Sequence, residues 1–329
     1  MGVLVDGEWH PDTEALIDAD SGSFERTPSV FRGEVSPDGK HPPEADRYHL
    51  YISRACPWAH RTMLVRALKG LEAAISVDIV DPVRINDGWE FAPDKSDCTP
   101  DTVNGFSYLR DVYTKADPDC SGRVTVPVLW DKTAETIVNN ESSDIIQQLD
   151  SAFTPFATRD VSLFPPEYPV NEVIEEIYDP INNGVYRAGF AKAQEPYDRA
   201  VTDLFAALEE WEERLSEQRY VCGDRLTAAD ICLFTTLYRF DEIYHTHFKC
   251  NNRELTAFPN LWGHTREIYQ LPGVAATCNM AHCKQHYYQS HRDINPTGLI
   301  PIGPDPAFDE PHKRGQLPGE PPASLQQGT

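Results

Sequence analysis

The residues around Cys56 are the clearest candidates for chemistry in this sequence. Cys56 lies in Arg54-Ala-Cys-Pro-Trp-Ala-His-Arg61, between a short aromatic and aliphatic run at 48–52 and a helical pattern that Pro57 can open. A thiol in that position faces unpaired backbone N–H groups and the positive end of the helix dipole. Both favour the thiolate, which is the nucleophilic form of cysteine. The pattern indicates a reactive thiol rather than a buried structural cysteine.

The residue three positions after Cys56 decides which thiol chemistry to expect. A Cys-x-x-Cys motif would have its second cysteine where this chain has Ala59. Because no neighbouring thiol can close a disulfide with Cys56, a mixed disulfide formed there has to be resolved by an external small thiol. The sequence therefore predicts thiol-dependent chemistry rather than dithiol exchange.

Composition limits the class of protein. The chain has 329 residues, 40% of them hydrophobic, which is enough for two domains with a core. A formal charge of −23 and a pI near 4.8 repel phosphate backbones and exclude nucleic acid as a partner. An acidic surface poor in lysine is typical of proteins that work in high salt, so we expect a halophilic source, with a soluble acidic enzyme as the alternative.

Targeting signals and cysteine usage predict the compartment. The first residues, Met1 to Asp6, have neither a cationic segment before an apolar one nor a myristoylation signal, and no apolar run approaches a membrane span. Eight cysteines without paired spacing fit a reducing cytosol better than a disulfide scaffold. We expect a cytoplasmic protein without a membrane partner.

The elements that must position Cys56 are predicted by periodicity. A strand at 48–52, a helix at 58–69 and a strand at 75–80 form a β-α-β unit, the opening of a thioredoxin-like fold. Strands then resume at 123–130 and 136–139. Pro127 within a β-branched run is explained if the Val126–Pro127 bond is cis and the strand begins after it. The exposed backbone of Val126 could then pair with a peptide-like ligand.

A second candidate site lies at the helix start Asn139-Asn-Glu-Ser-Ser-Asp144, with Asn140 the expected N-cap. Its free N–H groups and the Ser142 hydroxyl suit a carboxylate, and Glu141 suits an ammonium group. Together they match the head group of an α-amino acid. Plain helix capping by acidic residues explains the same pattern, so both interpretations stay open.

A long polar insertion at 81–120 separates the two halves of the predicted β unit. Within it, Trp89 comes directly after a glycine, and 106–115 has a helical pattern. An exposed Trp89 could cover a ligand, or the indole could pin the insertion to the body of the protein.

The domain plan is predicted from changes in composition. We expect an extended arm at 1–45, a thioredoxin-like domain at 46–155, an all-helical domain at 166–295 and an irregular tail at 296–329. In the helical part, Thr227 and Asp230 form a predicted capping box before a strongly apolar helix. Pro180 should interrupt an earlier helix.

This plan, α/β and then all-α, resembles the glutathione transferase fold, and the finer motifs resemble the glutathionyl-hydroquinone reductases of the Xi class. The motifs that carry the resemblance extend over residues 54 to 304 and are the Cys56 segment, Gly88-Trp-Glu-Phe91, Gly122 to Asp131, Asn140-Glu-Ser142, Asn183 to Gly189, Tyr238-Arg-Phe-Asp241, Phe248-Lys-Cys-Asn251, His286-Tyr-Tyr288 and Ile294 to Gly298.

The resemblance implies a role for each matching residue. Cys56 would attack the thioether sulfur of an S-conjugated hydroquinone, and Tyr186 would give a proton to the departing aromatic carbon. Tyr244 and Tyr287 would hydrogen-bond the Cys56 sulfur. The glutathione moiety would be held by seven residues, namely Trp89, Arg123, Val124, Thr125, Val126, Glu141 and Ser142. The family also pairs through its helical domains, which implies a homodimer.

Several alternatives stay open. In a halophile the thiol co-substrate could be gamma-glutamylcysteine, which has the same head group as glutathione and lacks the glycine. The same Cys56 could serve a general thioltransferase or dehydroascorbate reductase, or the fold could be a non-catalytic thiol-binding module. Two histidine and cysteine groupings, at 245–250 and 282–286, lack the spacing of a zinc site, so we expect no metal.

Overall fold

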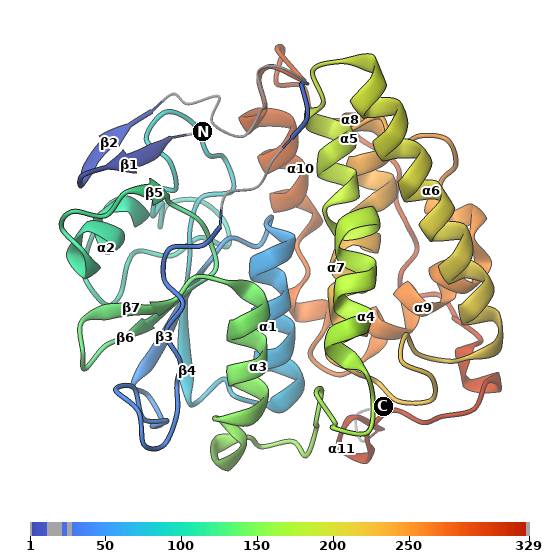
Figure 1. Cartoon of the computed structure of the whole chain (residues 1–329), viewed down its shortest axis with the longest axis horizontal. Coiled ribbons are helices and arrows are strands. Elements are labelled where there is room, and N and C mark those ends of the chain that lie inside the picture. The colour runs from blue at the N-terminus through green and yellow to red at the C-terminus, as the bar shows by residue number, and fades with distance from the viewer. Residues whose placement is uncertain (1, 12–21, 25–27, 327–329) are drawn as a thin grey trace. The chain divides into compact units, whose positions relative to one another are not determined.

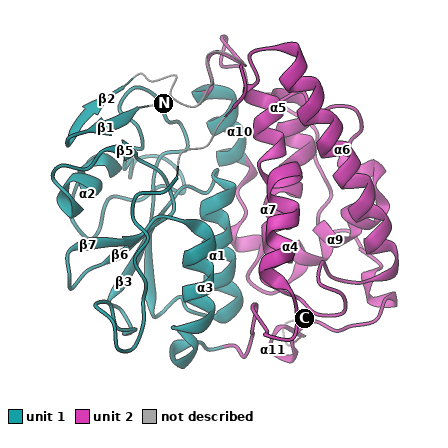
Figure 2. Cartoon of the chain, viewed as in Figure 1, with its two compact units in different colours: residues 1–15, 26–158, 281–290 teal, residues 16–25, 159–280, 291–329 magenta. Residues whose placement is uncertain are grey.

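The computed structural model describes residues 2–11, 22–24 and 28–326 (Figure 1). Its contacts divide the chain into two compact units, which have separate colours in Figure 2. Unit 1 comprises residues 1–15, 26–158 and 281–290, and unit 2 comprises residues 16–25, 159–280 and 291–329.

The units differ from the expected domain ranges in two respects. The division at Thr158 and Arg159 falls between the expected domain ranges 46–155 and 166–295. However, residues 281–290, which the sequence assigns to the helical domain, belong to unit 1. The expected arm is also shared, because its described residues 22–24 group with unit 2. A helical pattern shows that a helix forms but does not show which unit that helix packs against.

The main sheet of unit 1 has the strand order β4-β3-β6-β7. Strands β3 and β4 are parallel and are connected through helix α1, whereas β6 pairs antiparallel with both β3 and β7. Every residue of β3 is buried, as expected for a central strand. Helix α3 packs against α1. The bounds are β3 (Tyr48–Ile52), α1 (Pro57–Lys69), β4 (Ile75–Ile79), β6 (Val128–Asp131), β7 (Thr136–Asn139), α3 (Ser142–Ser151) and the short η1 (Thr154–Phe156).

Local sequence signals set the ends of these elements. Pro57 occupies the first turn of α1, and Gly70 ends the helix in the left-handed conformation at φ +65°, with its N–H donating to the Ala67 carbonyl. The Val126–Pro127 peptide bond is cis and β6 begins directly afterwards at Val128, which confirms the interpretation of Pro127. The β-α-β unit is confirmed as well.

The insertion is a structured part of unit 1. It contains helix α2 (Leu109–Ala116) close to the predicted range. Its preceding loop is anchored on the main sheet, because Asp78 of β4 accepts from the Thr102 N–H at 2.7 Å and the Tyr51 hydroxyl donates to Asp101 at 2.9 Å. Strand β5 comes after the insertion and forms a small antiparallel sheet with two strands of the arm. The sheet contains β1 (Val3–Val5), β2 (Glu8–His10) and β5 (Gly122–Arg123).

Unit 2 is helical, and unit 1 receives one later helix, α10 (Met280–Ser290). The longest helix, α6, buries apolar residues at helical spacing, as predicted. Pro180 lies in a π-helical segment, η2, between α4 and α5. The bounds in unit 2 are α4 (Val170–Ile177), η2 (Tyr178–Asn182), α5 (Gly184–Phe190), α6 (Gln194–Glu217), α7 (Ala228–Leu237), the π-helical η3 (Phe240–Tyr244), α8 (His245–His247), η4 (Leu255–Ala257), α9 (Pro259–Gln270), η5 (Ala275–Thr277), η6 (Arg314–Gln316) and α11 (Ala323–Gln326).

Helix α7 is the core helix of unit 2, and all ten of its residues are buried. The predicted capping box is present: Thr227 and Asp230 each bind the other's backbone N–H. The tail is tied to the same unit, because the buried Arg314 guanidinium donates to the Leu215 and Arg219 carbonyls at the end of α6. The described part of the predicted irregular tail is therefore anchored to unit 2 at Arg314.

Candidate functional site

The thiol of Cys56 is held at the start of α1. Cys56 is the N-cap residue of that helix, with φ −76° and ψ 121°, and its side chain is partly exposed. Its Sγ donates to the Val126 carbonyl oxygen at 3.6 Å, so the residue before the cis proline lies beside the thiol. The sequence predicted the helix-start position of Cys56, and the structure adds the contact with Val126.

Helix α10 brings Tyr287 to the same part of unit 1. The buried thiol of Cys283 on α10 lies 3.8 Å from the Arg54 carbonyl and 3.9 Å from the Ala55 carbonyl, directly before Cys56. Tyr287 comes one helical turn later, on the same face of α10. Its side chain is 1% exposed. The helix that carries Tyr287 therefore packs beside the loop that carries Cys56.

Trp89 is buried, at 3% exposure, which favours the alternative in which the indole pins the insertion over the one in which an exposed indole covers a ligand. Its ring stacks on His286 of α10 with centroids 5.2 Å apart, and the Arg84 guanidinium lies 4.9 Å from the ring centroid. His286 is fixed in turn by a 2.7 Å hydrogen bond between Nδ1 and the Pro82 carbonyl. Within the described residues, the buried Nε1 of Trp89 has no hydrogen-bond partner. The indole therefore anchors the insertion on α10, and its N–H group has no acceptor among the described residues.

The start of α3 corrects one prediction. Its N-cap is Glu141 and not Asn140, because the Glu141 carboxylate accepts from the Ser143 N–H at 3.4 Å. Asn140 instead pairs with the arm: its N–H donates to the Phe31 carbonyl, and its Oδ1 accepts from the Phe31 N–H, both at 3.0 Å. An Asn-Asn-Glu sequence offers three capping residues in a row, and the contact with Phe31 decides between them.

The Glu141 carboxylate is surrounded by hydroxyl groups. Ser29 of the arm donates to its Oε2 at 2.9 Å, Ser143 donates to Oε1 at 3.3 Å and Ser142 approaches Oε1 at 3.5 Å. Glu141 remains partly exposed, whereas Ser142 is buried. A partly exposed carboxylate at a helix start is suited to an ammonium group, and the nearby N–H groups are suited to a carboxylate.

The backbone of 123–126 joins these groups. Arg123 and Thr125 are partly exposed, while Val124 and Val126 are buried at 3% and 4%. Among the described residues, the Val126 N–H has no hydrogen-bond partner. Unit 1 therefore brings together Cys56, the 123–126 backbone and, through α10, both Trp89 and Tyr287.

Tyr186 and Tyr244 belong to unit 2, where they lie in one aromatic cluster. Their ring centroids are 6.0 Å apart, and both rings contact Phe248, at 5.5 Å and 5.6 Å. Tyr186 lies four residues after the π segment η2, and Tyr244 ends the π segment η3. Single π turns inside helices occur often at functional sites. The structure thus places both tyrosines beside irregular helix segments in unit 2.

Three residues of unit 1 contribute to this arrangement and were not predicted as site residues. Ser29 binds Glu141, His286 stacks on Trp89, and Tyr113 of α2 bonds to Thr125 and Asn140. The His-Tyr-Tyr motif at 286–288 was a usable signal for His286. Ser29 and Tyr113 had no such signal, because neither belongs to a motif that carried the resemblance.

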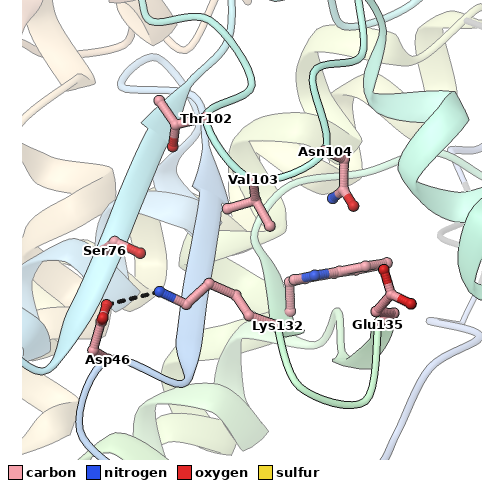
Figure 3. A pocket seen from close by; sticks show the side chains of 8 residues that line it. Asp46, Ser76, Thr102, Val103, Asn104, Lys132 and Glu135 are labelled. Atoms are coloured by element: carbon pink, nitrogen blue, oxygen red, sulfur yellow. Dashed lines mark hydrogen bonds and ion pairs between the residues drawn. The ribbon is translucent and has the colours of Figure 1, made fainter.

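Unit 1 also has a pocket lined by other residues (Figure 3). It has a volume of about 440 Å³, and its lining includes no predicted site residue. Lys132 pairs with Asp46 across it at 2.7 Å, and Glu135 pairs with Lys115 at 2.8 Å. The charged groups of this pocket are thus already paired within the protein. The complete lining is Asp46, Ser76, Thr102, Val103, Asn104, Trp130, Lys132 and Glu135.

The histidine and cysteine groupings have other contacts. His247 lies 3.2 Å from the ring nitrogen of His291, and burial lowers the pKa of His247 to about 4. His282 pairs with the Ser96 carbonyl at 2.9 Å. In the part of the chain that the structure describes, no three histidine, cysteine or carboxylate side chains gather in a metal-binding arrangement. None of the described helices is both long and apolar enough to cross a membrane.

Comparison with known proteins shows the family. Residues 55–152 match the model of the glutathione S-transferase N-terminal domain, and residues 194–267 match that of the C-terminal domain. The glutathionyl-hydroquinone reductase YqjG of Escherichia coli is 48% identical, over 95% of this chain and 98% of that protein. PcpF of Sphingobium chlorophenolicum, a protein of the same description, is 47% identical over 92% and 96%.

Solved structures agree with these sequence relationships. A Xi-class transferase from Natrialba magadii is 52% identical, with a TM-score of 0.91 over 97% of this chain and 98% of that chain. The glutathione-bound structure of E. coli YqjG has a TM-score of 0.87 at 45% identity, over 95% and 99%. A two-unit molecule with a thiol at the first helix start and these matches belongs to the glutathione transferase family. Within that family, the chain belongs to the Xi class, the glutathionyl-hydroquinone reductases.

Proposed function

We propose that this chain is a thiol-dependent reductase that removes glutathione or gamma-glutamylcysteine from S-conjugated hydroquinones. The single observation that carries the proposal is the partly exposed Cys56 thiol at the N-cap of α1, with Ala59 in place of a second thiol. A thiolate attacks sulfur readily, and a mixed disulfide at a lone cysteine requires a second thiol for release. Relatives described as glutathionyl-hydroquinone reductases support the same reaction.

The reaction balances in two steps. In the first, the Cys56 thiolate attacks the thioether sulfur, a sulfur–sulfur bond forms, and the sulfur–carbon bond to the ring breaks. The electron pair stays on the ring carbon, which takes a proton and becomes the free hydroquinone. In the second, an external thiolate attacks the mixed disulfide and releases a small disulfide and the Cys56 thiolate. Overall, the thioether sulfur and the sulfur of the external thiol are each oxidised by one electron, and one aryl carbon is reduced by two.

Three tyrosines supply the proton and stabilise the thiolate in this proposal. Tyr186 donates the proton to the ring carbon, because a phenol can donate without adding a charge to an apolar site. Tyr244 and Tyr287 donate hydrogen bonds to the Cys56 sulfur. The position of Tyr287 on α10, which packs beside Ala55, supports its role. The pairing of Tyr186 with Tyr244 in one aromatic cluster supports a shared function for these two residues.

The thiol part of the substrate is held by unit 1. The Val126 backbone binds the cysteinyl part as a peptide edge, and Glu141 and Ser142 bind the amino-acid head group. Trp89 offers its unpaired indole N–H, and Arg123 offers a cation on β5. The glutathione-bound structure of YqjG supports glutathione as the thiol. Because Glu141 and Ser142 address the gamma-glutamyl group, gamma-glutamylcysteine fits the same residues.

Mass spectrometry of the intact protein tests this proposal. After incubation with a glutathionyl-hydroquinone and no second thiol, we expect a glutathione-sized adduct on Cys56 and one equivalent of free hydroquinone. Cys56→Ser should give neither product, while its circular dichroism spectrum and thermal midpoint stay unchanged. The same experiment with the gamma-glutamylcysteine conjugate identifies the preferred thiol. The absence of an adduct with both conjugates, at low and at high salt, would contradict the reductase proposal.

A general thioltransferase is the second candidate, because a relative 43% identical to this chain is described as an omega-like glutathione transferase. That activity uses the same Cys56 on small disulfides or dehydroascorbate. Turnover of a small disulfide without turnover of the aryl thioether would favour it. A Cys56 that resists alkylation at neutral pH would favour the third possibility, a non-catalytic thiol-binding module.

The proposal also includes the cellular location, the oligomeric state and the source of the enzyme. A cytoplasmic location is supported by eight cysteines that form no disulfide within the described residues, and a homodimer by membership of the transferase family. A formal charge of −23 supports a halophilic source. Light scattering during size-exclusion chromatography measures the oligomeric state. A thermal midpoint that does not rise between 0.1 M and 2 M KCl would contradict the halophilic assignment.

A further inference from the structure

The insertion in unit 1 contains a buried tyrosine with an unusual number of partners. The side chain of Tyr113, on α2, is 0% exposed. Its hydroxyl donates to the Thr125 carbonyl at 2.8 Å and accepts from the Thr125 N–H at 3.2 Å. It also accepts from Nδ2 of Asn140 at 3.0 Å. A single phenol therefore uses its donor and two acceptor sites at once.

The two partners of Tyr113 belong to the two segments that would hold the thiol substrate. Thr125 lies directly before Val126, whose carbonyl contacts the Cys56 thiol. Asn140 lies directly before Glu141, the N-cap of α3. Thr125 and Asn140 are separated by fourteen residues of chain, 126–139, which include β6, a turn and β7. The Tyr113 hydroxyl is thus a direct link between the peptide edge and the head-group site.

The arm completes the same network from the opposite side of Asn140. Phe31 binds Asn140 through both backbone groups at 3.0 Å, and its ring packs edge-on against the Tyr113 ring with centroids 5.7 Å apart. Asn140 is consequently held at its backbone N–H, its Oδ1 and its Nδ2. Burial raises the pKa of Tyr113, so the hydroxyl keeps its proton and remains a donor to Thr125 at neutral pH.

We propose that Tyr113 is a positioning residue that sets the distance between the 123–126 peptide edge and the Glu141 head-group site, and so determines affinity for the gamma-glutamyl thiol part of the substrate. This inference rests on the proposed function, because it takes the thiol to bind at those two segments. It also assigns a role to the insertion, because α2 holds Tyr113 where its hydroxyl contacts both segments.

Steady-state kinetics on Tyr113→Phe test the inference. The substitution removes only the hydroxyl and keeps the buried ring. We expect KM for the glutathionyl-hydroquinone to rise about tenfold, as the loss of buried hydrogen bonds predicts, while kcat stays within about twofold. Asn140→Ala removes the hydrogen bond from Asn140 to the Tyr113 hydroxyl. It should likewise raise KM while kcat stays within about twofold. General loosening of the protein would lower kcat and the thermal midpoint together.

Tyr51→Phe is the matched control. Tyr51 is also 0% exposed in unit 1, and its hydroxyl donates to Asp101 and accepts from Asn104, away from both thiol-binding segments. The control should lose thermal stability to a similar extent and leave KM unchanged. A KM within twofold of wild type in Tyr113→Phe, or an equal rise in Tyr51→Phe, would overturn the inference. If Tyr113→Phe does not fold, an unchanged KM in Asn140→Ala overturns it.

A binding measurement separates this inference from the proposed function. Wild-type protein without turnover of any conjugate would refute the reductase proposal but not the role of Tyr113. Isothermal titration with glutathione, and with gamma-glutamylcysteine, then decides: about tenfold weaker binding by Tyr113→Phe than by wild type supports the inference. Equal binding by the two proteins, or no binding of either thiol to wild type, refutes it.

Discussion

Two helix starts in this molecule have the same ingredients and different surroundings. The start of α7 in unit 2 has Thr227 and Asp230, and the start of α3 in unit 1 has Glu141 and Ser142. Each combines a carboxylate with a hydroxyl near free N–H groups. The α7 pair is completely buried, whereas Glu141 is partly exposed.

The partners of the two carboxylates explain the contrast. Asp230 accepts from the N–H groups of Val221 and Thr227, both at 2.8 Å, and pairs with His264 Nε2 at 2.9 Å. All of these groups lie in the core of unit 2. Glu141 is surrounded by serine hydroxyls, which water or a ligand can replace at little cost. A carboxylate with buried, fixed partners stabilises the fold, and one with exchangeable partners can bind a ligand.

The largest effect is expected at Asp230. Asp230→Ala leaves two buried N–H groups and one imidazole without a partner, so the free energy of unfolding should fall by about 3–5 kcal/mol. Urea denaturation measures the change. KM per folded molecule should not change, because Asp230 contacts no thiol-binding residue among its hydrogen-bond partners. If Asp230→Ala is as stable as wild type and has a raised KM, the carboxylate of α7 serves ligand binding rather than stability, contrary to the comparison.

A smaller effect, and on a different quantity, is expected at Glu141. Glu141→Gln keeps one capping oxygen and removes the charge that would pair with the ammonium group of the thiol. KM for the conjugate should rise about tenfold, as the loss of a charge-assisted hydrogen bond predicts, and stability should change by less than about 1 kcal/mol.

Asp144→Asn is the matched control for Glu141→Gln. Asp144 lies in the first turn of the same helix and pairs with Arg32 at 2.9 Å. Its substitution removes the same charge from the same helix dipole and should leave KM unchanged. If both substitutions raise KM equally, the helix dipole and not the head-group contact is responsible.

More of the α7 helix start than of the α3 helix start could be predicted from the sequence. The Thr-x-x-Asp spacing is a local signal, so the capping box at 227 and 230 could be recognised with its partners. At 139–141 the sequence offered three capping residues, and the choice of Glu141 depends on Phe31, more than one hundred positions earlier. The presence of a capping residue at 139–141 was predictable from the sequence, and the contact with Phe31 that selects Glu141 was not.

The same limit applies to the rest of the site. Cys56, the cis bond before Pro127 and the β-α-β order have short-range signatures, and all three appear in the structure. The membership of α10 in unit 1 depends on packing between segments more than two hundred residues apart, such as Cys283 against Arg54 and Ala55. Periodicity along the chain contains no information about such contacts.

The smallest effect is expected for a pair of exposed charges at the start of α3, which extends the comparison of buried and exposed carboxylates. Arg32 and Asp144 form an ion pair at the start of α3 in which the side chains are 53% and 26% exposed. The hydrogen bonds that the Arg32 guanidinium donates to Asp144 raise the pKa of Arg32, which is therefore charged throughout the working range. Exposed pairs contribute about 0–1 kcal/mol, so Arg32→Gln should lower the free energy of unfolding by less than about 1 kcal/mol at 0.1 M KCl.

Salt then distinguishes this pair from the buried carboxylate. The screening length falls from about 10 Å at 0.1 M to about 3 Å at 1 M, so the difference between Arg32→Gln and wild type should disappear in 2 M KCl. The deficit of Asp230→Ala should persist there, because buried partners are not screened. Urea denaturation of both variants at the two salt concentrations measures this directly. If the Arg32 deficit remains undiminished in 2 M KCl, this exposed pair contributes through packing or a fixed network, and exposure alone does not separate the two kinds of helix start.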